Sequence, residues 1–331
     1  MRQISRIALL AIFGLLPGVG VAKTPTRSCE NTAQYRLVEL PFLPKLITAT
    51  GVVAGTNETR RAVVWRKASG LESLSVPEGF HYTDPVGFTK SGDLIVNAMD
   101  IQSKKRRAFF YSKGSTLALA GNQTWAHAID SSGIIVGEWV PDGSARTEPV
   151  YWDQEKRPHS IKTCCGGVIT AVNKAGEMIG NAYDDQGRYH AFAWSPSQGR
   201  RTLGPSEDFS SALAINDAGH ILFTAGKETY LDRAGRSQSL KLSPKLDSSA
   251  QAINNCDFVV GGFGPFSDSY RAFLWTEKAG FQDLNSLLSD DPAAKKGWTL
   301  ELASAINDRG EIVGQGELNG DDRGFLLIPK R

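Results

Sequence analysis

Apolar and polar positions alternate along this chain in short runs, and one arrangement of them recurs. Its clearest copy runs from Ala303 to Gly314, where two apolar runs flank the polar turn Asn307-Asp308-Arg309-Gly310. The Asn side chain can accept hydrogen bonds from the backbone two residues on, and the Gly takes a positive φ without a Cβ clash. The stretch therefore predicts a β-hairpin with one of the longer loops.

Seven copies of this hairpin follow one another at intervals of 38 to 53 residues. Aligned on the turn glycine, they are centred on Gly51, Gly92, Gly133, Gly176, Gly219, Asp257 and Gly310. In every copy the residue three places earlier is Thr, Asp or Asn, and the residues four places before and two places after are apolar. A period of this length with four short strands per unit is typical of β-propellers. The sequence predicts seven blades of about 43 residues.

The two ends of the repeat array complement each other. Tyr35–Leu40 alternates like the last strand of the other units, whereas the final unit has no strand of that kind after Arg323–Leu327. If the N-terminal strand completes the final blade, the ring closes and no exposed sheet edge remains. The predicted fold is an all-β, seven-bladed β-propeller over residues 35–331, closed by its N-terminal strand.

The third strand of most units reads Arg-Ala-Phe-Leu-Trp or a variant of it, as in Arg271–Trp275. Apolar residues on both faces indicate a sheet packed between two others. Its Trp and Phe rings are expected to fill the gap between blades rather than to bind sugars. Small residues five places before the turn centre are expected near the axis, where blades approach closely: Gly87, Ala128, Ala171, Ala214, Ala252 and Ala305.

The segment from Met1 to Ala22 has the pattern of a secretory signal peptide, with Arg2 and Arg6 ahead of the apolar run Ile7–Leu16. The run is too short and interrupted for a membrane span. Residues 23–34 are expected to form a polar N-terminal arm. The mature protein is therefore expected to be secreted or periplasmic, without a membrane span.

The net charge of +2, with 22% charged residues, favours neither nucleic acid nor an anionic membrane surface as a partner. The one basic cluster, Lys104–Arg107, is interpreted as a solvated hairpin loop.

Three units carry a longer shared motif, Ala-x-x-Ile-Asn-x-x-Gly-x-Ile-Val-Gly followed by His/Arg-Ala-Phe-Leu-Trp or a variant of it. They lie at Ile169–Trp194, Ala250–Trp275 and Ala303–Leu327. The motif resembles the bacterial HAF-repeat family of predicted extracellular proteins. The resemblance implies an exported repeat protein and supplies no catalytic residue. Thr48 and Thr89 depart from the motif by replacing its Asn.

A search for chemistry finds no phosphate-binding loop, zinc-protease motif, Cys-x-x-Cys or nucleophile elbow. The histidines share no ligand spacing, and the sequence predicts neither a cofactor nor a metal site. His127 is the histidine expected near the axis, in packing or channel solvent. Trp298 ends the long insertion before the seventh hairpin, and both residues are candidates for a ligand-binding face.

The four cysteines, Cys29, Cys164, Cys165 and Cys256, permit three pairings in an oxidising compartment. A bridge between Cys29 and Cys256 would attach the arm to the ring. The adjacent Cys164 and Cys165 could instead form a strained bridge with each other.

Two function classes fit these observations. One is an exported, monomeric binding module for a glycan, peptide or protein. The alternative is a polysaccharide hydrolase or lyase at the channel mouth, with separated carboxylates such as Glu148 and Glu301 brought together by the fold. Because no acid/base constellation is recognisable, the sequence favours a binding module that is not an enzyme.

Overall fold

The computed structural model describes residues 34–112, 114–141, 143–144, 146–163, 165–205, 209–242, 247–265, 270–288 and 297–330. Contacts divide the chain into Met1–Glu30 and a compact unit, Asn31–Arg331, that holds all of the described residues. The signal peptide (1–22) and the arm (23–34), except its last residue, lie outside the described residues and stay predictions.

Blade 1 consists of β2 (Leu43–Ile47), β3 (Val53–Thr56), β4 (Ala62–Arg66) and β5 (Gly70–Ser73). Blade 2 consists of β6 (Tyr82–Phe88), β7 (Leu94–Asp100), β8 (Lys105–Ser112) and β9 (Ser115–Ala118). Blade 3 consists of β10 (Asn122–Ile129), β11 (Ile135–Val140), β12 (Glu148–Trp152) and β13 (Pro158–Ser160). Blade 4 consists of β14 (Gly167–Val172), β15 (Met178–Tyr183), β16 (Tyr189–Ser195) and β17 (Gly199–Thr202).

Blade 5 consists of β18 (Ser210–Ile215), β19 (His220–Ala225), β20 (Glu228–Arg233) and β21 (Arg236–Ser239). Blade 6 consists of β22 (Ser248–Ile253), β23 (Val259–Phe263), β24 (Arg271–Thr276) and β25 (Gly280–Asp283). The 3₁₀ helix η1 (Leu284–Leu288) precedes blade 7, which consists of β26 (Trp298–Ile306), β27 (Ile312–Leu318), β28 (Asp321–Pro329) and β1 (Tyr35–Leu40).

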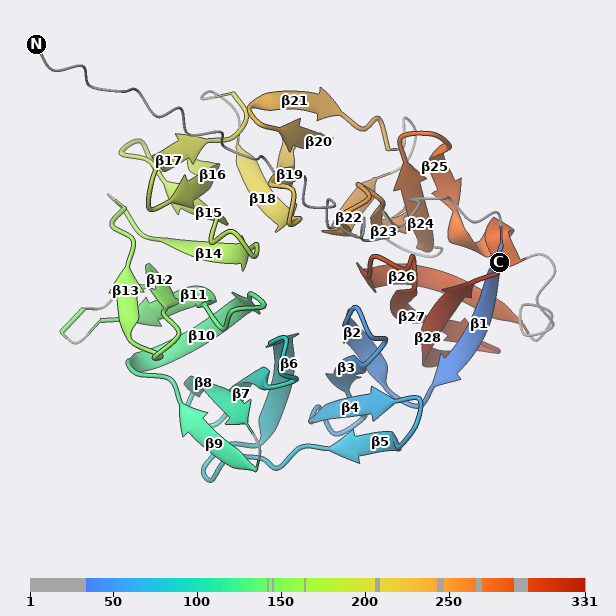
Figure 1. Cartoon of the computed structure of the whole chain (residues 1–331), viewed down its shortest axis with the longest axis horizontal. Helices are drawn as coiled ribbons and strands as arrows, with labels where there is room; N and C mark the ends of the chain where they lie inside the picture. Colours follow the sequence, from blue (N-terminus) through green and yellow to red (C-terminus); the bar gives the residue numbers. More distant parts are fainter. Residues whose placement is uncertain are drawn as a thin grey trace, which may run out of the picture. The chain divides into compact units, whose positions relative to one another are not determined.

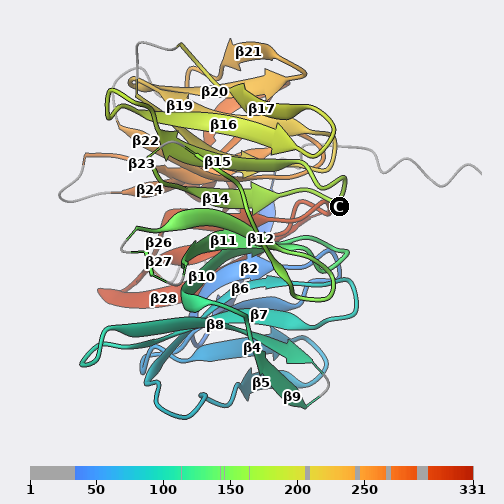
Figure 2. The same cartoon turned by 90° about the vertical axis from the view of Figure 1, so that its left-hand side faces the viewer.

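The seven antiparallel sheets form a ring in which the first strand of each blade lies innermost (Figure 1). Seen from its edge, the ring has strands that run across its thickness, so turns emerge at both faces (Figure 2). This confirms the predicted seven-bladed propeller. Among the described residues no helix is long and apolar enough to cross a membrane.

The ring closes as the sequence predicts. β1 pairs with β28 from Tyr35 opposite Pro329 to Leu40 opposite Gly324, and Figure 1 shows β1 beside β28 with the C-terminus at its end. Tyr35, Leu37 and Leu40 are buried by this pairing. Burial also raises the pKa of the Tyr35 phenol far above its ordinary value.

One side-chain contact recurs at three junctions between neighbouring blades. The Thr83 hydroxyl, on the first strand of blade 2, accepts a hydrogen bond from the Ala62 backbone of blade 1 at 2.8 Å. Thr124 and Ser210 make the same contact with Ala108 and Ala191 in the preceding blades. All three alanines are fully buried, because the first strand of the next blade covers them. The small residue of the third-strand motif therefore marks the contact between blades.

Candidate functional site

The seven hairpin turns have the predicted geometry. In blade 7, Asn307 Oδ1 accepts hydrogen bonds from the backbone of Arg309 at 2.9 Å and Glu311 at 3.1 Å. The Gly310 amide donates to the Asn307 carbonyl oxygen at 2.9 Å. All seven turn centres have a positive φ, including Asp257, whose φ is 57°. That non-glycine residue is held by its carboxylate, which His220 and Arg233 of blade 5 both contact at 2.8 Å.

The turn asparagines also bond to one another around the ring. The Nδ2 atom of each donates to the backbone carbonyl of the matching residue in the next blade. These bonds run from Asn173 to Asn216 (3.2 Å), from Asn216 to Asn254 (3.1 Å), from Asn254 to Asn307 (3.0 Å) and from Asn307 to Thr48 (3.0 Å). We call this chain of side chains the asparagine belt. It joins blades 4, 5, 6, 7 and 1.

The belt stops where the sequence departs from Asn. Thr48, Thr89 and Asp130 occupy the turn position in blades 1, 2 and 3, and none of them carries an amide that could donate to the next blade. Asp130 uses its carboxylate within its own turn, where it accepts from the backbone of Ser132 and Ile134. The two substitutions that depart from the repeat motif therefore lie in the gap of the belt.

A cavity of about 720 Å³ lies at this gap. Its apolar part includes Ile47, Val86, Phe88 and Ile129, from the first strands of blades 1 to 3. Its rim carries hydroxyl groups and two cations: Thr48, Thr50, Thr89, Ser91, Ser131, Arg66 and Lys90. We call this cavity the turn pocket. Its volume lies in the range of small-molecule sites.

The two cations at the rim differ in their surroundings. Arg66 Nη1 pairs with Glu72 at 2.8 Å, so its charge is balanced. Lys90 is exposed and forms no ion pair with any residue that the structure describes. Lys90 is therefore available to a ligand carrying a negative charge or a hydrogen-bond acceptor.

Each innermost strand contains a β-bulge at the same repeat position. At this position the register between first and second strands skips one residue in every blade: Lys45, Val86, His127, Thr170, Leu213, Gln251 and Ser304. None of these seven side chains is buried. A bulge re-aims a side chain and interrupts regular pairing. We call these residues the bulge ring. Val86 also lines the turn pocket, so pocket and ring meet there.

The last residue of the Ile-Val-Gly motif is glycine because it lies opposite the bulged strand. A Cβ atom on Gly314 would collide with the carbonyl oxygen of Leu302 on the bulged strand. Gly55, Gly137, Gly180 and Gly261 are in the same position in their blades. Glycine is needed there for close backbone approach, because its φ is not in the left-handed region. The sequence shows this glycine as part of the motif, but its cause lies in the opposite strand.

His127 lies in the bulge ring, on β10 beside Ala128, which lines the turn pocket. Its ring is accessible to solvent, yet burial among the surrounding protein lowers its pKa, and Arg106 adds to this effect while Glu138 opposes it. Arg106 and Glu138 pair at 2.8 Å. Within the described part of the chain, the other four histidines each lie within 3.4 Å of an aspartate, and His127 lies near none.

Trp298 lies far along the chain from this site. It is the first residue of β26 in blade 7, paired with Leu318, and is half-buried against the core that includes Leu284 and Leu287. Trp298 and His127 belong to different blades, so the structure does not place the two candidates in one cluster. The insertion ahead of Trp298 (289–296) lies outside the described residues.

Glu148 and Glu301, the two carboxylates suggested for a hydrolase or lyase, lie in different blades. Glu148 in blade 3 accepts a hydrogen bond from Ser160 at 2.6 Å. Burial raises the pKa of Glu301 in blade 7, and the charges of Asp322 and Glu317 add to this effect. Cys29 and Cys164 lie outside the described residues, so the bridge between Cys29 and Cys256 and the alternative bridge between Cys164 and Cys165 both stay predictions.

Comparison with known families assigns the sequence to a family. A family model described as "Protein of unknown function (DUF3466)" matches residues 119–325, which is more than half of the chain. The chain belongs to this family. The match spans blades 3 to 6 and most of blade 7, and the HAF-repeat resemblance stays a prediction beside it. A search among curated proteins gave no match.

Solved structures show the same fold at low identity. Virginiamycin B lyase from Staphylococcus aureus is 11% identical, with a TM-score of 0.58 over 89% of this chain and 100% of that one. The β-propeller domain of the Trilobed protease from Pyrococcus furiosus is 9% identical, with a TM-score of 0.59 over 90% and 96%. A puromycin-hydrolyzing peptidase from Mycobacterium tuberculosis is 11% identical, with a TM-score of 0.55 over 88% and 52%. These likenesses establish the propeller fold and no activity.

Proposed function

We propose that this protein is an exported, monomeric binding module that holds a small ligand in the turn pocket. The observation that carries this proposal is the coincidence of the 720 Å³ cavity with the three turns that lack the belt asparagine. In blades 4 to 7 the belt side chains occupy the spaces between the turns. In blades 1 to 3 the shorter Thr48 and Thr89 leave that space to the pocket.

The lining defines the chemistry of the ligand. Val86 and Phe88 on β6 and Ile129 on β10 offer apolar contact, which favours a ligand with an apolar body. The hydroxyl groups of the rim and the Nζ of Lys90 favour an anionic or hydrogen-bond-accepting group at one end. We infer a ligand of amphipathic character, with its apolar part toward the bulge ring.

The test fills the pocket with belt residues and measures the binding of the fluorescent probe 8-anilinonaphthalene-1-sulfonate, which combines an apolar body with an anion. The variant Thr48→Asn/Thr89→Asn should lose most of the probe's fluorescence gain. It should also unfold at higher denaturant, by about 1 kcal/mol for each new hydrogen bond. Lys90→Glu should weaken probe binding without a change in stability.

The control is Thr59→Asn, which makes the same substitution on an exposed loop outside the pocket. It should leave probe binding unchanged. Equal probe binding by the wild type and the Thr48→Asn/Thr89→Asn variant would contradict the assignment of the ligand site to the turn pocket.

A further inference from the structure

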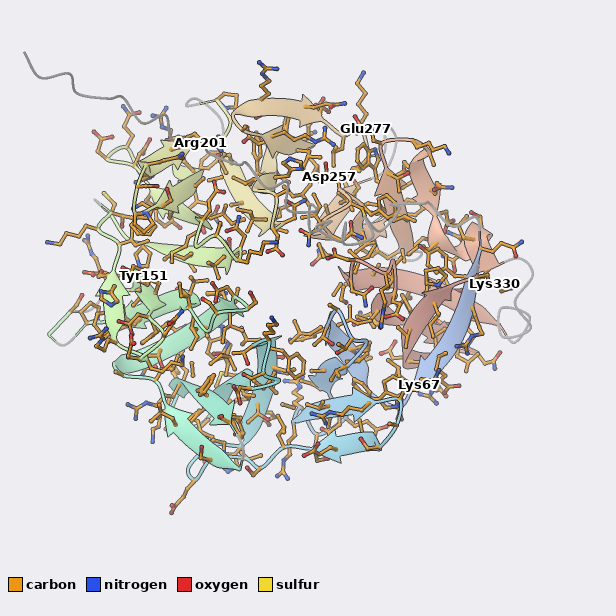
Figure 3. The ribbon with its side chains drawn as sticks, viewed as in Figure 1. Lys67, Tyr151, Arg201, Asp257, Glu277 and Lys330 are labelled. Atoms are coloured by element: carbon orange, nitrogen blue, oxygen red, sulfur yellow. The ribbon has the colours of Figure 1, made fainter. Side chains whose placement is uncertain are left out.

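A second cavity, of about 430 Å³, lies where the outer strands of blades 3 and 4 diverge. It is lined by Tyr151, His159, Ser160, Ile161, Lys162, Trp194 and Arg200. Figure 3 shows Tyr151 on the outer side of the ring, near β13. We call this cavity the rim pocket. It shares no residue with the turn pocket, so its role does not depend on the function proposed above.

Three aromatic rings form one wall of the rim pocket. The Tyr151 and His159 rings stack at 4.8 Å with an angle of 13° between their planes, and the Tyr151 and Trp194 rings lie 5.9 Å apart. Asp153 fixes the His159 ring through a contact of 2.9 Å to Nε2. That contact, with those from Arg157, holds the pKa of Asp153 well below its ordinary range, so the carboxylate keeps its charge. The wall is thus fixed before any ligand arrives.

Two cationic side chains line the rim pocket beside these rings, and neither has an ion-pair partner among the described residues. Lys162 and Arg200 are exposed and form no ion pair within the described part of the chain, and the lining includes no carboxylate. The Arg200 guanidinium lies 5.0 Å from the centre of the Phe192 ring, which holds it in place.

The cavities between other blades have a different charge pattern. Between blades 4 and 5, the rings of Phe223 and Tyr230 also stack, at 5.3 Å, but Arg201 there pairs with the buried Asp232 at 2.9 Å. Between blades 1 and 2, Arg66 pairs with Glu72. A cavity lined by aromatic rings and by an Arg that pairs with a carboxylate is thus the common result where the outer strands of two blades diverge. The rim pocket differs by its two unbalanced cations.

We infer that the rim pocket binds a carboxylated saccharide. A sugar ring presents a face of C–H groups that packs on aromatic rings. Its hydroxyl groups can accept from Lys162 and donate to Ser160 Oγ, whose own proton is donated to Glu148. A uronate carboxylate supplies the negatively charged partner that Arg200 and Lys162 lack. The position on the outer side of the ring allows a long chain to cross the pocket without threading the propeller.

The experiment is calorimetric titration of the full-length protein with tetragalacturonate and with its methyl ester, which keeps the rings and removes the charge. The wild type should bind the free acid at least about tenfold more tightly than the ester. Lys162→Gln/Arg200→Gln should reduce the affinity for the acid by about tenfold or more. Trp194→Leu should weaken the binding of both forms, because it removes the ring and keeps an apolar side chain.

The matched control is Lys67→Gln/Lys278→Gln, which removes two exposed positive charges from blades 1 and 6. It should bind tetragalacturonate like the wild type. Equal affinity for acid and ester, no binding of the acid at millimolar concentration, or an equal loss in the control variant would overturn the inference. Tighter binding of 4-hydroxybenzoate than of tetragalacturonate would also overturn it, because a small aromatic acid would then be the better ligand. Circular dichroism confirms that each variant is folded.

Discussion

His127 has no partner on the neighbouring strand because it is the extra residue of a β-bulge. In a regular strand its side chain would face one of the two adjacent blades. In the bulge it reaches solvent within the innermost layer of the ring, where the surrounding protein disfavours the charged imidazolium and lowers its pKa. The bulge therefore supplies an ionisable group that is neutral at neutral pH.

This environment predicts a pH effect on stability. An unfolded histidine has a pKa of about 6.5, and the folded value lies below it. Between the two values the unfolded chain binds more protons, so stability falls as the pH drops through about 6.5. His127→Gln removes this loss. In thermal unfolding, the variant should gain Tm relative to the wild type at pH 5.5 and show a smaller difference at pH 8.

Gln251→Asn serves as the control for this experiment, because it changes the same bulge position in blade 6 without a titratable group. Its Tm difference from the wild type should be the same at both pH values. A His127→Gln difference that does not change with pH would contradict the protonation argument.

At the residue scale, the sequence predicts what depends on local chemistry. The Asx side chain and the positive φ of the turn follow from the residues within it, as Asn307 and Gly310 show. The bulge could not be predicted, because it depends on which residues of the second strand lie opposite. Two histidines share a local pattern, Asp-x-x-x-Arg-x-His, in which Asp153 and Asp184 each bind the Arg and the His of their own turn.

At the scale of the element, the asparagine belt gives the hairpin turns of blades 4 to 7 two tasks each. The Oδ1 atom of Asn254 closes its own turn through Cys256 and Phe258, and Nδ2 reaches the next blade. An aspartate can perform the first task and not the second. The sequence shows the preference for Asn in blades 4 to 7, but a turn considered alone explains Asp and Asn equally well. Only the position of the neighbouring turn explains the amide.

Asn254→Asp separates these two tasks. The variant keeps the acceptor for its own turn, loses the 3.0 Å bond to Asn307 and turns a carboxylate oxygen toward that carbonyl oxygen. Because Asn254 is buried, we expect the free energy of unfolding in urea to fall by about 1 to 3 kcal/mol.

The matched control for the belt is Asn57→Asp. Asn57 closes the turn between β3 and β4 with the same acceptor contacts, to the backbone of Thr59 and Arg61, and donates to no other blade in any contact found among the described residues. Its substitution should change stability by less than about 0.5 kcal/mol. Equal effects of the two substitutions would show that the belt bonds contribute nothing.

At the scale of the whole molecule, the closure of the ring could be predicted from the sequence, because it depends on counting strands. One strand precedes the first complete unit and the last unit is one strand short, so the two must pair. The turn pocket could not be predicted in this way. Thr48 and Thr89 stand out in the sequence as departures from the motif, but their meaning depends on their being neighbours in the ring and next to Asp130.

Closure by β1 predicts that one charge on its buried face destabilises the whole propeller. Leu37 is 7% exposed and packs in the core shared by blades 6 and 7. Leu37→Asp places an unpaired carboxylate in that core, which should cost about 3 kcal/mol or more in urea unfolding. Release of β1 also uncovers the edge of β28, so the variant should associate on size-exclusion chromatography.

Arg36→Asp is the matched control for closure, because it places the same carboxylate one residue earlier, on the exposed face of the same strand. It should unfold within about 0.5 kcal/mol of the wild type and elute as the wild type does. The comparison isolates the contribution of the buried face of β1 to ring closure, because both variants change the charge of β1 and only one disrupts its packing. If Leu37→Asp unfolded and eluted like Arg36→Asp, β1 would be an attached strand rather than the element that holds the ring closed.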